Sequence, residues 1–366
     1  MFADRTSSIT RPLCATARNK HSLRAPVKSL KPVLAAADPT GHRVHSLSGR
    51  AARLRVQGRY REARPLLREA LRLAEDFFGA NSLEVASVLN QLGMLGKYDG
   101  HFKDAEAAYR RALRIVAEAG QGDQALAAAL FHNLGGLEHA RGRFAAGEPY
   151  ARRSVAIREQ LVGPEHPDTA ADVAALAGLL DGQGRYDEAE KLYWRALTIF
   201  ERAYGPEHYD IAVSLNNLAA IYQARGKFAI ADQLYRRALE MKERLLGPDH
   251  LDVALTLNNL GVLYTRCGRP GEAVRLYQRA LNIFGGTLSP RHPKLVQCRK
   301  NLRKLLSTRG KHKQLAANSE TLPASQILKC EKIIRSVKVA SDAVNGIDPA
   351  KRLLRIDAGA KANPCP

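Results

Sequence analysis

Apolar residues follow a helical spacing in two consecutive blocks, and this double block recurs along most of the chain. In residues 212–246 the first block is Leu215, Leu218, Ala219 and Tyr222, and the second is Ala231, Leu234, Tyr235, Ala238, Leu239 and Met241. Both blocks keep to spacings of three and four residues, which place side chains on one face of a helix. Gly226 separates the blocks, and Gly247-Pro248 follows the second because proline cannot continue a helix. The pattern therefore predicts a hairpin of two helices.

The hairpin repeats with a fixed period of 42 residues. The glycines that end the first helices are Gly58, Gly100, Gly142, Gly184, Gly226, Gly268 and Gly310, and the matching leucines are Leu92, Leu134, Leu176, Leu218, Leu260 and Leu302. Glycine suits such turns because it adopts the left-handed backbone conformation without steric cost. A constant period in this range is typical of a stacked-repeat solenoid. Proteins of that shape usually offer an extended surface for binding, so we expect a scaffold with these seven glycines as its turn residues.

Spaced alanines and aromatic residues complete the repeat, and the unit resembles the tetratricopeptide repeat. The resemblance rests on pairs such as Leu134-Gly135 and Leu260-Gly261 and on the turn Gly142-x-Phe144. The usual repeat of that family has 34 residues. The eight additional residues here fall in a longer second helix and in loops such as GPEHPD at Gly163. In this respect the chain is similar to the long-repeat subfamily found in kinesin light chains and in many bacterial tetratricopeptide proteins. The resemblance implies an all-α, right-handed superhelix of about six helical hairpins and a C-terminal capping helix.

Three segments are expected from the limits of the repeat. Residues 1–43 are basic and without periodicity, which predicts a disordered N-terminal segment. Residues 44–310 form the repeat array. Residues 311–366 form a basic C-terminal tail, in which Ile327–Val339 is compatible with one short helix.

The net charge of +21 comes mostly from the two flanks of the array, because residues 49–298 contain 34 basic and 29 acidic residues. Basic termini can bind nucleic acid or an anionic membrane surface, which is one alternative function. However, Phe2 is the only aromatic residue in 1–43 and residues 311–366 contain none, so stacking on bases and specific nucleic-acid recognition are not expected. No run of 18 apolar residues predicts a membrane-spanning helix.

No pattern in the sequence predicts catalysis, a metal site or a cofactor, and we expect a protein that is not an enzyme. One histidine recurs in each long loop, at His166, His208, His250 and His292. Stacked repeats hold equivalent residues roughly 10 Å apart, too far to share one metal ion. We therefore interpret these histidines as residues that stabilise helix starts. The scattered cysteines are expected to be free thiols in a reducing compartment, which favours the cytoplasm, with organellar targeting or export as minor alternatives.

Asparagines recur in the middle of the first helices, although asparagine is a mediocre helix former. Two interpretations are open: hydrogen bonds between neighbouring helices, or pairing of the carboxamides with the backbone of a bound peptide. The family resemblance supports the second for Asn133, Asn217, Asn259 and Asn301, fails at Ala175 and is weaker at Gln91. The predicted peptide-binding set is Asn90, Asn133, Asn216, Asn217, Asn258, Asn259, Asn301, Lys97, His139 and Arg266.

The sequence thus predicts an interaction scaffold that binds a peptide segment of a partner protein in a concave groove. Such a peptide would carry apolar anchors and at least one acidic group, because the expected groove is lined by small residues in its middle and by basic residues at its ends. A second alternative is an adaptor subunit of a larger complex, and self-association is left open. The identity of the partner does not follow from the sequence.

Overall fold

The computed structural model describes residues 39–120, 123–288, 290 and 292–319, and within them it contains thirteen helices and no strand. The helices are α1 (Pro39–Val56), α2 (Tyr60–Phe78), α3 (Leu83–Tyr98), α4 (Phe102–Glu118), α5 (Gln124–Ala140), α6 (Phe144–Val162), α7 (Pro167–Gly182), α8 (Tyr186–Tyr204), α9 (Tyr209–Ala224), α10 (Phe228–Leu246), α11 (Leu251–Arg266), α12 (Pro270–Thr287) and α13 (Pro293–Ser319). Most of the expected N-terminal segment and the expected helix at Ile327–Val339 lie outside the described residues. Because α1 begins before residue 44 and α13 ends after residue 310, the exact limits of the three segments stay predictions.

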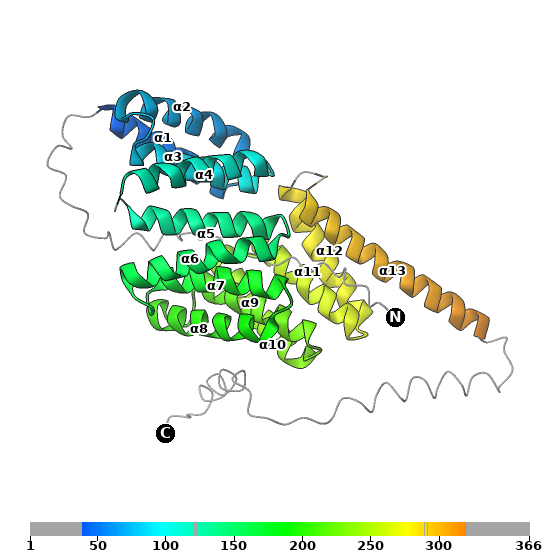
Figure 1. Cartoon of the computed structure of the whole chain (residues 1–366). Helices are drawn as coiled ribbons and strands as arrows, with labels where there is room; N and C mark the ends of the chain where they lie inside the picture. Colours follow the sequence, from blue (N-terminus) through cyan, green and yellow to red (C-terminus); the bar gives the residue numbers. More distant parts are fainter. Residues whose placement is uncertain (1–38, 121–122, 289, 291, 320–366) are drawn as a thin grey trace, which may run out of the picture.

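The helices pair in chain order, and the pairs stack into one solenoid (Figure 1). Each odd-numbered helix from α1 to α11 packs on the even-numbered helix that follows it, which gives six hairpins, here called repeats 1 to 6. Helix α13 packs on α12 and α11 and, within the described residues, pairs with no further helix, as the capping helix of the array. The predicted all-α array of six hairpins and a cap is confirmed.

The first helices of the repeats form one layer of the solenoid and the second helices form the other. Every first helix contacts the first helix of the next repeat, from α1 with α3 to α11 with α13. Among the described residues, second helices of neighbouring repeats do not pack on each other to a comparable extent. In a curved stack the inner layer is the more closely spaced one. The first helices therefore form the inner, concave layer.

Small residues allow the helices of the array to approach each other. Ala105, Ala189 and Ala231, each five residues after a glycine turn, are fully buried. Gly93 on α3 lies against the ring of Tyr109 on α4, where an added Cβ would come within 2.4 Å of a ring carbon. Since helices pack at about 8–10 Å only when the side chains at the crossing permit it, these positions set the tight packing within each repeat.

Glycine turns separate the two helices of every hairpin. Gly58, Gly100, Gly142, Gly184, Gly226 and Gly268 have φ between 69° and 82°, a region in which other residues are strained. Gly310 differs, because α13 continues through it to Ser319 and the turn expected there is not formed. At the other glycines, a second helix packs back on the first and stabilises the turn. In the described residues no second helix follows α13.

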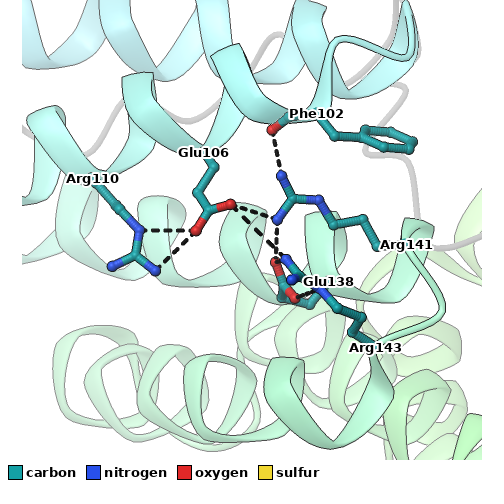
Figure 2. A network of polar contacts seen from close by, with 6 residues as sticks. All are labelled: Phe102, Glu106, Arg110, Glu138, Arg141 and Arg143. Atoms are coloured by element: carbon teal, nitrogen blue, oxygen red, sulfur yellow. Dashed lines mark hydrogen bonds and ion pairs between the residues drawn. The ribbon is translucent and has the colours of Figure 1, made fainter.

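Charged side chains join neighbouring repeats, through contacts between the second helix of one repeat and the end of the first helix of the next (Figure 2). Arg141, which follows α5, contacts Glu106 of α4 at 2.6 Å and Glu138 of its own helix at 2.9 Å, and it donates to the carbonyl oxygen of Phe102 at 2.7 Å. Arg225, which occupies the position of Arg141 two repeats later, contacts Glu190 of the preceding repeat in the same way at 2.5 Å. None of the described helices combines the length and the apolar character needed to cross a bilayer.

Candidate functional site

The loop histidines cap helices, as the sequence predicts. In α7, α9, α11 and α13 the ring Nδ1 of the histidine accepts a hydrogen bond from the backbone N–H two residues later, at 3.1–3.3 Å. The residues are His166, His208, His250 and His292. Each ring thus satisfies one of the N–H groups that a helix start leaves without a partner. Among the described residues no group of three or more potential ligands could hold a metal ion.

The recurring asparagines pair across the repeat boundaries. Asn133 of α5 donates from Nδ2 to Oδ1 of Asn90 of α3 at 2.8 Å, and Asn301 of α13 donates to Asn258 of α11 at 3.1 Å. A longer contact of 3.4 Å joins Asn259 of α11 to Asn216 of α9. In each pair, the second asparagine of one repeat bonds to the first asparagine of the preceding repeat. We call this series of contacts along the inner layer the asparagine ladder.

The ladder realises the first of the two interpretations that the sequence leaves open, because its carboxamides bond between neighbouring first helices. Asn216, Asn217, Asn258 and Asn259 are each at most 3% exposed, and Asn133 is 7% exposed. Asn90 and Asn301, towards the two ends, are only half-buried. An interhelical hydrogen bond does not prevent a carboxamide from binding a peptide as well, since each amide offers two donors and two acceptor sites.

The three other residues predicted for the groove lie on the inner layer against aromatic rings. The ammonium of Lys97 is 5.1 Å from the ring centroid of Tyr98, and the guanidinium of Arg266 is 5.6 Å from that of Phe228. The imidazole of His139 contacts the ring of Phe144 edge-on at 5.1 Å. These three residues come from α3, α5 and α11, so they are distributed along the array and do not form one cluster.

A buried polar triad of His132, Arg158 and Asp172 replaces the ladder where the asparagines are missing, at Ala174-Ala175 of α7. Asp172 of α7 is 3% exposed, and its carboxylate lies 2.6 Å from Nδ1 of His132 and accepts from Nε of Arg158 at 3.2 Å. Burial alone would raise the pKa of Asp172, but the hydrogen bond of His132 and the nearby positive charges lower it below its ordinary value. The carboxylate is therefore ionised at neutral pH.

A second buried polar triad occupies the same register positions two repeats later. The ammonium of Lys242, which is fully buried, donates to Oγ1 of Thr256 at 3.0 Å, and that hydroxyl lies 3.3 Å from Oδ1 of Asn216. Burial lowers the pKa of Lys242 to about 8, against the opposing effect of Asp252. The triad connects the second helix of repeat 5 to the asparagine ladder.

Neither triad follows from the repeat pattern, because each contains a charged residue on the second helix where other repeats carry an apolar one. The matching positions carry Val116 in place of Arg158 and Leu130 in place of Asp172. An alignment of the six repeats in register would show that the unusual residues occur in pairs, Arg158 with Asp172 and Lys242 with Thr256. The contacts of Arg141 with Glu106 are easier to find, since a carboxylate recurs every 42 residues at Glu106, Glu148, Glu190 and Asp232.

Comparison with known proteins gives a family and a fold. The model of the tetratricopeptide repeat matches residues 43–118, 126–202, 171–244, 210–284 and 252–314. No curated protein matches the chain.

Solved structures with a similar arrangement include BtubC (BKLC) from P. vanneervenii, which is 24% identical with a TM-score of 0.49 and covers 68% of this chain and 94% of its own. A putative kinesin light chain from Podosopora anserina is 22% identical with a TM-score of 0.44, over 54% of this chain and 94% of its own. The STAND protein PH0952 from Pyrococcus horikoshii, with a tetratricopeptide repeat sensor, is 16% identical with a TM-score of 0.51, over 73% of this chain and 39% of its own. At such identities the likeness is one of fold. The family match over most of the array places the chain in the tetratricopeptide repeat family.

Proposed function

We propose that the chain is a non-enzymatic interaction scaffold that binds a peptide segment of a partner protein on its concave layer of first helices. Repeats of this family mediate protein interactions, and the extended inner layer offers many positions for an elongated ligand. Among the described residues, Cys267 and Cys298 are free thiols. Free thiols persist in reducing compartments, and we propose the cytoplasm as the location.

The asparagine ladder carries this proposal. The bond between Asn133 and Asn90 uses one N–H of Asn133 and the oxygen of Asn90. It leaves the oxygen of Asn133 as an acceptor and the N–H groups of Asn90 as donors, which are the two partners that a peptide unit needs. The interhelical bond also fixes the orientation of both carboxamides, so that a ligand would not have to order them. Pairing of this kind reads the backbone of a peptide and leaves specificity to side-chain contacts.

The experiment selects 12-residue peptides from a phage-displayed library with the full chain and with the double variant Asn90→Ala/Asn133→Ala, which removes the pair from which the proposal is argued. Gln278→Ala, an exposed residue of α12, is the matched control. We expect the wild type and the control to enrich the same peptides and the double variant to bind them at least tenfold more weakly. Circular dichroism at the assay temperature checks that the double variant is folded.

Two outcomes would overturn the proposal. One is that the wild type enriches no peptide over a bare support. The other is that the folded double variant binds the selected peptides as tightly as the wild type does, which would place the binding surface away from the ladder. An adaptor subunit of a larger complex would pass the same test, because it would also bind its neighbours through this layer.

A further inference from the structure

One polar residue of each first helix stands three residues before the glycine turn, and these residues lie in the same register on neighbouring helices. They are Arg55, Lys97, His139, Asp181, Gln223 and Thr265. Because consecutive first helices are in contact, the set runs along the inner layer as a single row. We call it the inner row. Its charge changes along the array, from two cations in repeats 1 and 2 to neutral side chains in repeats 5 and 6.

The two cations of the inner row converge on one aromatic ring. The guanidinium of Arg55 lies 5.5 Å from the ring centroid of Tyr98, and the ammonium of Lys97 lies 5.1 Å from it. Burial lowers the pKa of Lys97 to about 8, and the positive charge of Arg55 contributes to the shift. Holding two cations side by side in a partly buried place is unfavourable unless a negative charge compensates them.

No carboxylate of the described residues compensates either cation. Most arginines of the array contact an acidic side chain, as Arg64 contacts Asp99 at 2.7 Å. By contrast, Arg55 and Lys97 have no ion pair within the described part of the chain. Asp99 is close to this place, but Arg64 and the ring of His101 already occupy it. Within the described residues, the two cations therefore lack an anionic partner.

A buried hydroxyl group without a partner lies at the same place. The hydroxyl of Tyr109 on α4 is fully buried and has no hydrogen-bond partner. In repeat 6 the equivalent Tyr277 hydroxyl lies 3.2 Å from Oγ1 of Thr265, which is the inner-row residue of that repeat. The inner-row residue of repeat 2 is Lys97, and the charge of Arg55 also acts on Tyr109. Burial raises the pKa of Tyr109, so its hydroxyl keeps its proton and is a hydrogen-bond donor at neutral pH.

We infer that Arg55, Lys97 and the hydroxyl of Tyr109 bind the carboxylate of an aspartate or glutamate side chain of the peptide. Two cations and one buried O–H donor are complementary to a carboxylate, which accepts hydrogen bonds through both oxygens. The inference rests on the proposed function, because it assigns one residue of the same peptide. It also gives the bound peptide a register, with its acidic residue at repeats 1 and 2.

The site belongs to this end of the array alone. Position 98, whose tyrosine carries both cations, is matched by Ala140, Gly182 and Ala224 in the following repeats. In repeat 3 the inner-row residue is His139, which packs on Phe144. Within the described repeats, the combination of two cations, a shared tyrosine ring and an orphan tyrosine hydroxyl occurs once, so a peptide that shifted by one repeat would lose it.

The test uses 12-residue peptides displayed with a blocked C-terminus, so that only side chains supply carboxylates. The full chain, Arg55→Gln/Lys97→Gln and the control Lys103→Gln, an exposed residue of α4, select from the same library. We expect one position with at least fivefold enrichment of aspartate and glutamate in the wild-type and control pools. The double variant loses that enrichment. A selected peptide with its acid replaced by the amide binds the wild type at least tenfold more weakly and the double variant less than twofold more weakly.

Two further measurements sharpen the assignment. Tyr109→Phe removes only the hydroxyl, and it should weaken the acidic peptide three- to tenfold without affecting its amide analogue. Synthetic peptides that end in a free acid or an amide distinguish a side chain from a chain terminus, and we expect equal affinities. A pool without acidic enrichment, or an enrichment that survives Arg55→Gln/Lys97→Gln, would overturn the inference even if peptides bind the ladder. A wild type that selects no peptide would overturn both this inference and the proposed function.

Discussion

Arg158 and Lys242 occupy the same register position in repeats 3 and 5, sixteen residues after the glycine turn, and both extend a cation to the first helix of the next repeat. Arg158 contacts Asp172, and Lys242 contacts Thr256, which are again matched positions. The corresponding residue of repeat 2, Val116, is apolar and buried. The same junction is thus built either from apolar contacts or from a buried polar triad.

Asp172→Leu should destabilise the array strongly, because it leaves the half-buried side chains of Arg158 and His132 without their carboxylate. Removing one partner of a buried pair typically costs about 3–5 kcal/mol. Urea unfolding followed by circular dichroism measures the change in the free energy of unfolding. The matched control is the triple variant His132→Asn/Arg158→Val/Asp172→Leu, which copies Asn90, Val116 and Leu130 from the junction between repeats 2 and 3. We expect it to regain most of the lost stability, and an equal loss in both variants would contradict the explanation.

The sequence predicts the helix pairs well because their signals are local and repeated. A glycine every 42 residues and the apolar spacing around Leu218 are sufficient to place the hairpins. Gly310 shows the limit of this signal, since the glycine is in register but α13 continues through it. The turn at the other glycines is stabilised by a second helix that folds back, and no such helix follows α13 among the described residues.

The candidate site is predicted only as a set of positions. The sequence places Asn90 and Asn133 in matching helices, but their bond joins the first asparagine of one repeat to the second asparagine of the next. That offset depends on the rotation of neighbouring helices about their own axes. The residue pattern of the sequence does not specify this rotation. For the same reason, the orphan hydroxyl of Tyr109 cannot be recognised from a tyrosine that recurs in four repeats.

The buried ammonium of Lys242 should make stability rise with pH on the alkaline side. Its pKa is about 8 in the folded protein, below its ordinary value of 10.5. Between these values the unfolded chain binds the proton and the folded chain does not, so the free energy of unfolding increases from about pH 8 to about pH 10.5. The full effect is on the order of 1–3 kcal/mol.

Lys242→Met is the matched variant for this measurement, because it keeps the length of the side chain and removes the titration. The difference between wild type and variant is compared at pH 7.5 and pH 10, since Lys97 titrates in the same range in both proteins. A difference that does not change between the two pH values would show that Lys242 is not a buried ammonium.

Two of the capping histidines, His208 and His292, should make the array less stable below neutral pH. Burial lowers the pKa of His208, and burial together with Lys294 lowers that of His292. For a group whose pKa is lower in the folded state, the stabilisation is complete above its ordinary pKa of about 6.5 and is lost as the pH falls below it. Protonation of Nδ1 also removes the cap, which is worth about 1 kcal/mol. His208→Asn/His292→Asn keeps a capping oxygen, so it should flatten the fall in unfolding free energy between pH 7 and pH 5. If the unfolding free energy of the double variant fell between pH 7 and pH 5 as steeply as that of the wild type, these two histidines would not be the cause of the pH dependence.

Two glycine-to-alanine exchanges should change stability in opposite directions. In Gly93→Ala the new Cβ would lie 2.4 Å from the ring of Tyr109, which is fully buried and cannot move aside, so we expect a loss of about 1–3 kcal/mol. Gly285 of α12 is exposed and has no neighbouring atom within 4 Å of such a Cβ. Gly285→Ala should therefore stabilise the chain by about 0.5–1 kcal/mol, because alanine favours the helix. Thermal unfolding of the two variants measures the sign directly, and destabilisation by Gly285→Ala would mean that α12 is not a continuous helix at that residue.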